Sequence, residues 1–317
     1  MRAIFIVNPE AGKGKGIEKL TANIRETAAR LNMQADVYMT TAPGDAERFA
    51  DEIGRTTAGT GEDVRLIACG GDGTLNEVLN GAMGYDNLAV GVVPIGTGND
   101  FCRNFPEDGD FLDMEAQLKG KIIKCDAIMY SGMLAGKEQT RYCANMFNIG
   151  FDCNVVDLTA KLKTYPLIAG SFAYLLGVAI TIIKKKGANL RVEIDGKVVE
   201  DGQLLLTTVS NGGYCGGGVH SSPYASVTDG IMDVNVIYNV SRIKFIKKFP
   251  YYAKGTHMEL PGIDKILYAG TCKKAKITPL DGTMRLCTDG EIVDAGEIEF
   301  EIVPGAFNLL VPAVTEK

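Results

Sequence analysis

The sequence predicts an α/β domain followed by a second domain built mainly from antiparallel strands. In the first part of the chain, short apolar stretches and amphipathic helix patterns alternate four times, which is typical of a mostly parallel sheet covered by helices. From residue 121 onward, strand-like stretches dominate and Asp-Gly dipeptides separate several of them, which indicates antiparallel pairing. The 317 residues are enough for one long or two ordinary domains.

The composition narrows the function classes. A content of 46% hydrophobic and 23% charged residues is typical of a soluble globular protein. The net charge of −6 gives no basic excess, so we do not expect a nucleic acid as partner. The eight cysteines form no CxxC pair and only two histidines are present, which argues against a zinc site and favours a reducing cytoplasm.

The elements of the first domain follow from the apolar pattern. Residues 3–7 form an unbroken apolar run, as expected of a buried parallel strand. Apolar residues at helical spacing then predict a helix that begins near Ile17 and reaches Leu31. The next expected elements are a strand at 35–39, a helix at 44–57, a strand at 64–68, a helix after residue 74 and a strand at 88–93. Polar, glycine-bearing loops follow all four strands, and open parallel sheets bind ligands at that edge.

The second domain is expected to be a sandwich or a barrel. Its predicted strands cover residues 121–130, 141–151, 189–195, 203–210, 231–238, 263–268, 273–278, 284–287 and 297–303. Helices are expected near 166–186 and 241–254, and the glycine run 216–218 is expected to form a loop near the ligand site. The last apolar stretch, 307–311, could belong to either domain.

One segment tests the expectation of a soluble protein. Residues 165–183 carry no charge over 19 residues, which is the threshold length for a membrane-spanning helix. Three alternatives remain open: a spanning helix, a buried core helix, and a lipid-facing helix whose flanking residues 184–186, all lysine, meet anionic headgroups.

The turn at residues 70–74, Gly-Gly-Asp-Gly-Thr, is the most informative motif. It joins the strand at 64–68 to a helix pattern, and its glycines let another molecule approach the backbone closely. Amides at such a turn form an anion site, so the motif predicts phosphate binding. The Asp72 carboxylate could orient a ribose hydroxyl, a donor amide or hydrated Mg²⁺. Thr74 and Glu77 stand three apart, which predicts a capping box.

Several motifs together resemble a known family. The Gly-Gly-Asp-Gly-Thr turn is shared by NAD kinases and by diacylglycerol and sphingoid lipid kinases, and the stretch 94–101, Pro-Ile-Gly-Thr-Gly-Asn-Asp-Phe, is similar to the lipid-kinase pattern. The Asn8-Pro9 loop, Thr40 ahead of Gly44-Asp45, the DGIMD stretch at 229–233 and the DGE stretch at 289–291 extend the match. The whole pattern resembles the bacterial soluble diacylglycerol kinase-like lipid kinases. One departure is that Glu10 and Ala11 stand where many relatives have a small residue and a serine, which puts hydroxyl contacts from this loop in doubt.

The resemblance implies a fold and a set of site residues. It implies a phosphofructokinase-like and NAD kinase-like α/β domain at 1–128, a β-sandwich lipid-substrate domain at 129–303, and a tail at 304–317 that packs back on the first domain. The family's Mg²⁺ site maps to Ser226, Asp229 and Ile231, its catalytic carboxylate maps to Glu291, and we assign further catalytic roles to Asp289 and Asp72. The expected ATP-binding set is Asn8, Pro9, Gly12, Lys13, Thr40, Gly70, Gly71, Asp72, Gly73, Thr74, Asn76, Glu77, Thr97, Asn99 and Asp100.

The expected function is therefore that of an ATP- and Mg²⁺-dependent lipid kinase that phosphorylates diacylglycerol or a related lipid and gives phosphatidic acid or its analogue. We expect a cytoplasmic enzyme of phospholipid metabolism that contacts the membrane reversibly, and the resemblance implies a homodimer. Two alternatives are an NAD kinase-like enzyme with a soluble substrate and a nucleotide- or lipid-binding protein without turnover.

Overall fold

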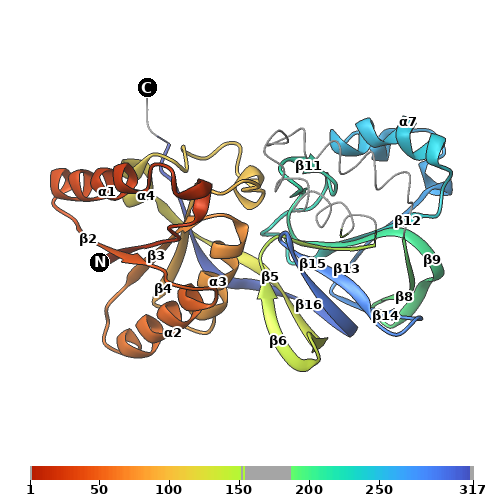
Figure 1. The fold of residues 1–317 in the computed structure, drawn as a ribbon, viewed down its shortest axis with the longest axis horizontal. Helices are drawn as coiled ribbons and strands as arrows, with labels where there is room; N and C mark the ends of the chain where they lie inside the picture. The colour runs from red at the N-terminus through yellow and green to blue at the C-terminus, as the bar shows by residue number, and fades with distance from the viewer. Residues whose placement is uncertain (1, 151–152, 154–186, 315–317) are drawn as a thin grey trace.

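A computed structural model of the chain describes residues 2–150, 153 and 187–314. Figure 1 shows an α/β part that contains the N-terminal elements and, beside it, a part dominated by strands. Long strands run between the two parts, so no flexible linker separates them. The predicted fold class, an α/β domain followed by an antiparallel β-rich domain, is confirmed.

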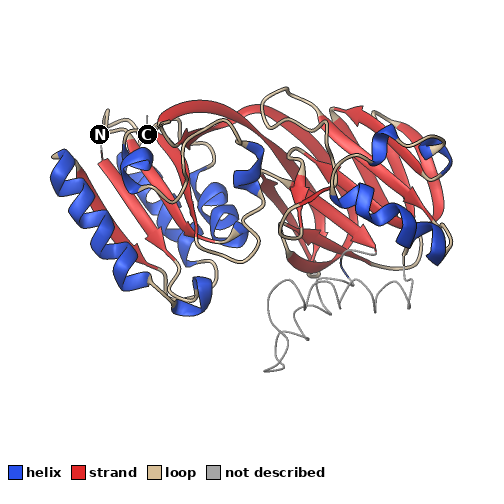
Figure 2. Cartoon of the chain, turned by 90° about the horizontal axis from the view of Figure 1, so that it is seen from above, coloured by secondary structure: helices blue, strands red, loops and turns tan. Residues whose placement is uncertain are grey.

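The first part is a parallel sheet between two layers of helices (Figure 2). Its strands lie in the order β2-β1-β3-β4-β16, and each neighbouring pair is parallel. Its elements are β1 (Arg2–Val7), η1 (Ala11–Gly14), α1 (Ile17–Leu31), β2 (Gln34–Met39), α2 (Asp45–Thr57), β3 (Val64–Gly70), α3 (Asp72–Ala82), β4 (Leu88–Pro94), η2 (Phe101–Asn104) and α4 (Met114–Leu118).

Side chains of the central strand β1 alternate between the two faces of the sheet. Ile4 and Ile6 are buried in the core that α2 and α3 complete, whereas Phe5 and Val7 are buried in the core that α1 and α4 complete. This alternation is the period of two that a strand imposes. A strand covered on both faces has no polar side, which explains the unbroken apolar run at 3–7.

The second part is antiparallel in every pairing that the described residues show. The pairings β9-β7-β15-β16-β14-β8-β9 form a closed circuit around one core, with β12 and β13 added beside β9. Its elements are β5 (Lys121–Leu134), β6 (Lys137–Cys143), β7 (Met146–Gly150), β8 (Ala188–Ile194), β9 (Lys197–Ser210), β10 (Tyr214–Cys215), β11 (Val219–His220), β12 (Met232–Tyr238), α7 (Arg242–Ala253), η3 (His257–Glu259), η4 (Ile263–Lys265), β13 (Leu267–Cys272), β14 (Lys274–Pro279), β15 (Met284–Thr288) and β16 (Glu291–Val311).

Two predicted strands differ from the structure in kind, while the stretches 203–210 and 297–303 lie within the longer strands β9 and β16. The stretch 141–151 is not one strand, because the chain breaks between β6 and β7, where the Asn145 carbonyl accepts the N–H groups of Asn211 (2.8 Å) and Gly212 (2.9 Å). The stretch 263–268 begins as the short helix η4, and pairing with β12 starts only at Leu267.

The uncharged segment 165–183 and the helix expected near 166–186 lie outside the described residues. None of the helices in the described part of the chain has the length and apolar character needed to cross a membrane.

The strands β5 and β16 connect the two parts. They pair antiparallel from Ala295↔Leu134 in the second part to Val311↔Lys121 in the first. Near its end, β16 also pairs parallel with β4, at Asn308↔Ala89 and Leu309↔Val90. The apolar stretch 307–311 therefore belongs to the first sheet. The domain boundary expected at residue 128 falls inside β5, so the chain crosses between the parts within regular structure.

Asp126 secures this crossing. The register of the β5–β16 pair shifts between Val303 and Phe307, so extra residues of β16 bulge out opposite Asp126. The buried Asp126 carboxylate accepts the N–H of Gly305 within the bulge and the N–H of Gly230, both at 2.7 Å. One side chain therefore fixes both the bulge and the turn at 229–230.

We predict that Asp126→Asn destabilises the protein. The amide group would present N–H groups to one of the two backbone donors, which leaves a buried donor unsatisfied at a cost of about 1–3 kcal/mol. Urea unfolding should give this loss, whereas the control Asp86→Asn, at an exposed position, should change the free energy of unfolding by less than about 0.5 kcal/mol. Equal stability of the two variants would contradict the role given to Asp126.

Candidate active site

Two glycine turns touch at the carboxyl edge of the parallel sheet. The turn after β3 and the turn after β4 approach so closely that a Cβ on Gly96 would overlap the Cα of Gly71. A Cβ on Gly12, in the loop after β1, would stand 3.1 Å from the carbonyl oxygen of Ile95. The three loops therefore meet backbone to backbone. Backbone amides gathered at glycine turns and at a helix N-terminus are suited to bind phosphate groups, which is the chemistry that a nucleotide requires.

Hydrogen bonds hold the glycine turns in place. The carbonyl oxygen of Gly70 accepts the N–H groups of Ile95 and Gly96, both at 3.0 Å. The Asn99 side chain accepts the Gly96 N–H (3.1 Å) and donates to the carbonyl oxygens of Pro94 (3.1 Å) and Gly96 (3.0 Å). Asn99 thus shapes the turn, while the neighbouring Thr97 side chain is exposed.

The loops after β1 and β2 are fastened to the same edge. Asn8 donates from Nδ2 to the Thr74 hydroxyl (3.3 Å), and Thr40 donates from its N–H to the Val7 carbonyl (2.9 Å). Pro9 follows Asn8, and the exposed Lys13 adopts a positive φ of 63° within η1. The expected ATP-binding residues of β1 and β2 therefore lie on the edge that carries the glycine turns.

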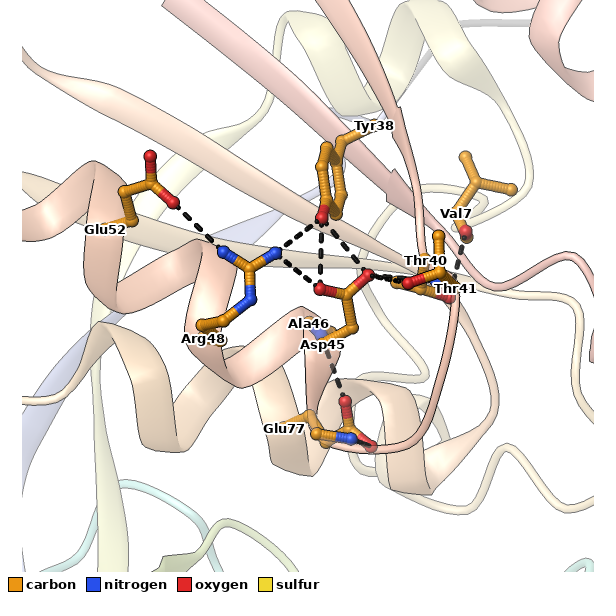
Figure 3. A network of polar contacts seen from close by, with 10 residues as sticks. Val7, Tyr38, Thr40, Thr41, Asp45, Ala46, Arg48, Glu52 and Glu77 are labelled. Atoms are coloured by element: carbon orange, nitrogen blue, oxygen red, sulfur yellow. Dashed lines mark hydrogen bonds and ion pairs between the residues drawn. The ribbon is translucent and has the colours of Figure 1, made fainter.

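Asp45 stabilises the loop after β2 (Figure 3). Its carboxylate accepts hydrogen bonds from the Thr41 N–H (2.9 Å), the Tyr38 hydroxyl (3.1 Å) and Arg48 (2.6 Å). The Arg48 guanidinium, followed by the Thr41 N–H, lowers the pKa of the Asp45 carboxyl to about 2. A charged carboxylate in the first turn of α2 also interacts favourably with the helix dipole.

The predicted capping box is wrong. Helix α3 begins at Asp72, its N-cap is Gly71, and no side chain caps it. Glu77 instead accepts the N–H groups of Gly44 (2.9 Å) and Ala46 (3.2 Å), at the N-terminus of α2 (Figure 3). Both oxygens of Glu77 thus have backbone partners, and its expected contact with ATP stays a prediction. The first amides of α3 remain without partners inside their own helix.

Asp72 and Asp100 face each other beside the glycine turns. Asp72 accepts the N–H groups of Asp100 (2.9 Å) and Phe101 (3.3 Å). Of the three kinds of partner that the sequence left open for Asp72, the structure thus shows donor amides. Asp100 accepts the Gly217 N–H through both oxygens (3.0 and 2.9 Å). Burial raises the pKa of both carboxyls, and the charge of Asp72 raises that of Asp100 further.

Asp289 lies close to the same negative charges. It occupies the tight turn between β15 and β16, with φ at 47°, and accepts the Met146 N–H (3.2 Å) and the Cys143 thiol (3.2 Å). Burial, followed by repulsion from Asp72, raises the pKa of the Asp289 carboxyl to about 7. Its bonds to the β6–β7 break give Asp289 a structural role here.

Glu291 is the carboxylate that faces α3. It begins β16, and its Oε1 stands 2.7 Å from the position that a Cβ on Gly73 would take. Although solvent reaches the side chain, the surrounding protein removes part of its hydration and raises the pKa of the Glu291 carboxyl, and the charge of Glu77 raises it further. The second part of the molecule thus delivers an acid to the first turn of α3.

The residues expected to bind Mg²⁺ lie in one turn. Asp229 accepts the Ile231 N–H (3.1 Å), and Ser226 lies 3.4 Å from Thr228 between hydroxyl oxygens. Burial, followed by repulsion from Asp229, raises the pKa of the nearby Asp233 to about 6. Within residues 2–150, 153 and 187–314, no group of three or more His, Cys, Asp or Glu side chains is arranged to hold a metal ion. The Mg²⁺ assignment therefore stays a prediction.

Sequence reasoning missed the contacts between α3 and β6. Asn76 and Asn80 both donate to the carbonyl oxygen of Tyr142 (3.2 and 2.9 Å), and Asn80 accepts the Tyr142 N–H (2.9 Å). Arg141 forms a 2.6 Å ion pair with Glu47 of α2. Asn76, expected at the ATP site, thus contacts the second part of the molecule. The loop at 216–218 is different, because its glycine run did predict a position near the ligand site. The Gly217–Asp100 bonds confirm that position.

Comparisons with known families cover nearly the whole chain. Residues 2–130 match the diacylglycerol kinase catalytic domain, and residues 145–311, more than half of the chain, match the YegS C-terminal NAD kinase beta sandwich-like domain.

Among curated relatives, a diacylglycerol kinase of Bacillus subtilis is 28% identical over 294 residues, which cover 92% of this chain and 89% of the relative. A diacylglycerol kinase of Staphylococcus carnosus is 28% identical over 293 residues, which cover 92% of this chain and 88% of the relative. Among solved structures, a diacylglycerol kinase from Bacillus anthracis superimposes with a TM-score of 0.69 at 20% identity, over 98% of this chain and 96% of that one, which shows a shared fold.

We predict that Asp289 makes stability depend on pH. Its carboxyl binds a proton more tightly in the folded protein (pKa about 7) than in the unfolded chain (about 3.9), so stability falls as pH rises between these values. From pH 5 to pH 8, the wild type should lose about 1–2 kcal/mol more than Asp289→Asn, after allowance for partial exposure of the group. Urea unfolding at both pH values measures this difference.

The control for this experiment is Asp264→Asn, which changes an exposed carboxyl and should keep the slope of the wild type. If Asp289→Asn kept that slope too, Asp289 would not hold a proton near neutral pH.

Proposed function

The chain belongs to the bacterial diacylglycerol kinase-like family of lipid kinases, and on this premise we propose that it transfers the γ-phosphoryl group of ATP to the free hydroxyl of diacylglycerol or a related lipid, giving phosphatidic acid or its analogue. The chain is thus a kinase. We propose ATP as the phosphoryl donor, Mg²⁺ as the metal and diacylglycerol or a related lipid as the acceptor.

One observation carries the proposal. The Glu291 carboxylate, delivered by β16, lies against Gly73 in the first turn of α3, next to the two touching glycine turns. Phosphoryl transfer to an alcohol requires a site that positions the phosphates and a group that accepts the hydroxyl proton. A backbone phosphate cradle and a carboxylate with a raised pKa, held side by side, meet both requirements.

The residues of the cradle suit a nucleotide with its metal. ATP with Mg²⁺ supplies the phosphoryl group and neutralises the charge that develops during transfer. The amides of Gly71, Gly73 and Thr74 would hold the phosphates, with the exposed Lys13 and Thr97 beside them. Asp72 and Asp100 would supply the carboxylates that Mg²⁺ prefers, and burial raises the pKa of each.

The acceptor would approach from the second part of the molecule. Glu291, rather than Asp289, is our proposed general base, because both Asp289 oxygens already accept hydrogen bonds from the β6–β7 break. A diacylglycerol acceptor resides in a membrane, so we also propose that the protein works in reversible contact with a lipid surface. A soluble acceptor such as NAD is the alternative, and it requires no such contact.

We predict that Glu291→Gln lowers kcat by about 10²- to 10⁴-fold, the usual contribution of a general base, while the Kd for ATP changes little. The assay measures transfer of the γ-phosphate with Mg²⁺, with diacylglycerol in mixed micelles and NAD offered in parallel. The control Glu26→Gln, on the exposed face of α1, should behave as the wild type. Turnover that survives in Glu291→Gln would remove the base assignment, and NADP as the product would move the acceptor to the soluble class.

A further inference from the structure

Helix α7 has apolar side chains on two opposite sides. On the inner side, Phe245, Phe249 and Tyr252 pack on a core that includes Ile237 and Leu267, beneath the helix. A surface helix of a globular protein needs one apolar stripe, which faces the core, and a polar face toward solvent. The inner side alone therefore accounts for how α7 is attached to the fold.

The outer side of α7 carries apolar residues that the fold does not use. Ile243, Ile246 and Tyr251 are 69%, 53% and 46% exposed, and helical spacing places them on one side of the helix, together with Lys247 and Lys254. Three of the eleven exposed large hydrophobic side chains in the described part of the chain thus gather on this one face. Exposed apolar side chains that gather on one face are typical of a surface that binds another protein or a membrane.

The charge around this face indicates which kind of partner it binds. No acidic residue occurs between Asp233 and Glu259, although the whole chain carries a net charge of −6. None of the basic side chains on or next to α7 forms an ion pair with a described residue. These basic residues are Arg242, Lys244, Lys247, Lys248 and Lys254. Exposed apolar side chains lie between cations that form no ion pair with a described residue, which fits a partner that is apolar inside and negative at its surface.

The position of α7 connects this face to the candidate active site. Gly255, just after the helix, lies so close to the His220 ring of β11 that a Cβ there would overlap it. The loop between β10 and β11 carries Gly217, whose N–H donates to Asp100. A partner bound to α7 would therefore lie near the β10–β11 loop, which contacts the candidate site. Helix α7 itself lies at the opposite end of the molecule from α1 (Figure 1).

We propose that the outer face of α7 docks on an anionic phospholipid bilayer. Ile243, Ile246 and Tyr251 insert at the boundary of headgroups and acyl chains, while Lys247 and Lys254 contact lipid phosphates, as in amphipathic helices that lie in the membrane plane. The inference deepens the proposed function, because it names the surface through which a lipid kinase of this structure reaches its acceptor.

The first test measures vesicle binding after charge reversal. Lys247→Glu with Lys254→Glu is compared with Lys19→Glu with Arg25→Glu, which changes the net charge equally on exposed positions of α1. Sedimentation uses vesicles of phosphatidylcholine with and without phosphatidylglycerol. The wild type should bind only the anionic vesicles, and salt should weaken the binding. The α7 variant should lose about 30-fold or more in partitioning, because each cation contributes about five-fold, while the α1 variant should match the wild type.

The second test removes the apolar contacts. Ile243→Ser with Ile246→Ser should lower binding to the anionic vesicles by about tenfold or more. The matched control is Leu112→Ser with Ile122→Ser, which removes two exposed apolar side chains of the α/β part and should leave binding unchanged. Equal binding by wild type and both α7 variants, or equal loss in the controls, would overturn the proposal. So would a wild-type dimer that the Ile243 and Ile246 changes dissociate, because a second copy would then cover the face.

A third measurement separates this inference from the proposed function. Turnover of a short-chain diacylglycerol that is monomeric in solution needs no vesicle, so both α7 variants should keep wild-type activity on it. A wild type that binds anionic vesicles through α7 but phosphorylates no lipid would sink the proposed function and leave the docking surface intact. If instead the wild type is active on the short-chain lipid and the α7 variants bind vesicles as well as the wild type, the proposed function would stand and the docking surface would be wrong.

Discussion

The pairing of β5 with β16 is the constraint on which the rest of the molecule depends. A strand pair that runs from one sheet into the other lets neither part shift without breaking ladder hydrogen bonds. The bulge in this pair is bound to the Asp126 carboxylate, and β16 itself begins at Glu291. The distance between the acid and the glycine turns is thus set by continuous backbone, supported by the α3–β6 contacts and not by a hinge.

The site concentrates negative charge and offers it few cations. Asp72, Asp100 and Asp289 lie near one another, and backbone amides satisfy much of their hydrogen-bonding capacity. Arg103, 3.6 Å from Asp100 between Nε and Oδ1, is a cation within reach among the described residues. Burial without full charge compensation raises each pKa, and such perturbation is common where a protein prepares a site for chemistry. A ligand that brings positive charge would relieve this repulsion.

The sequence predicted the features that local pattern controls. Apolar runs located the strands of the parallel sheet, and glycine turns after those strands located the candidate site, because strand ends meet at one edge. Tertiary partners decided what the pattern missed. Glu77 bonds the amides of α2 and not its own helix, and the Asn145 carbonyl, which accepts two amides of a distant loop, interrupts the predicted strand. Asp126 binds the N–H groups of Gly230 and Gly305, which are far from it in the sequence, so no local motif predicts these contacts.

The central claim is that the touching glycine turns hold the phosphates of ATP beside Glu291. Hydrogen exchange at the amides of residues 71–74 and 97–98, with and without a non-hydrolysable ATP analogue and Mg²⁺, tests it most directly, since amides that bind phosphate exchange more slowly. The structure predicts protection at both turns, together with the start of β16 at Glu291. Saturating nucleotide that leaves both turns unprotected would contradict the account.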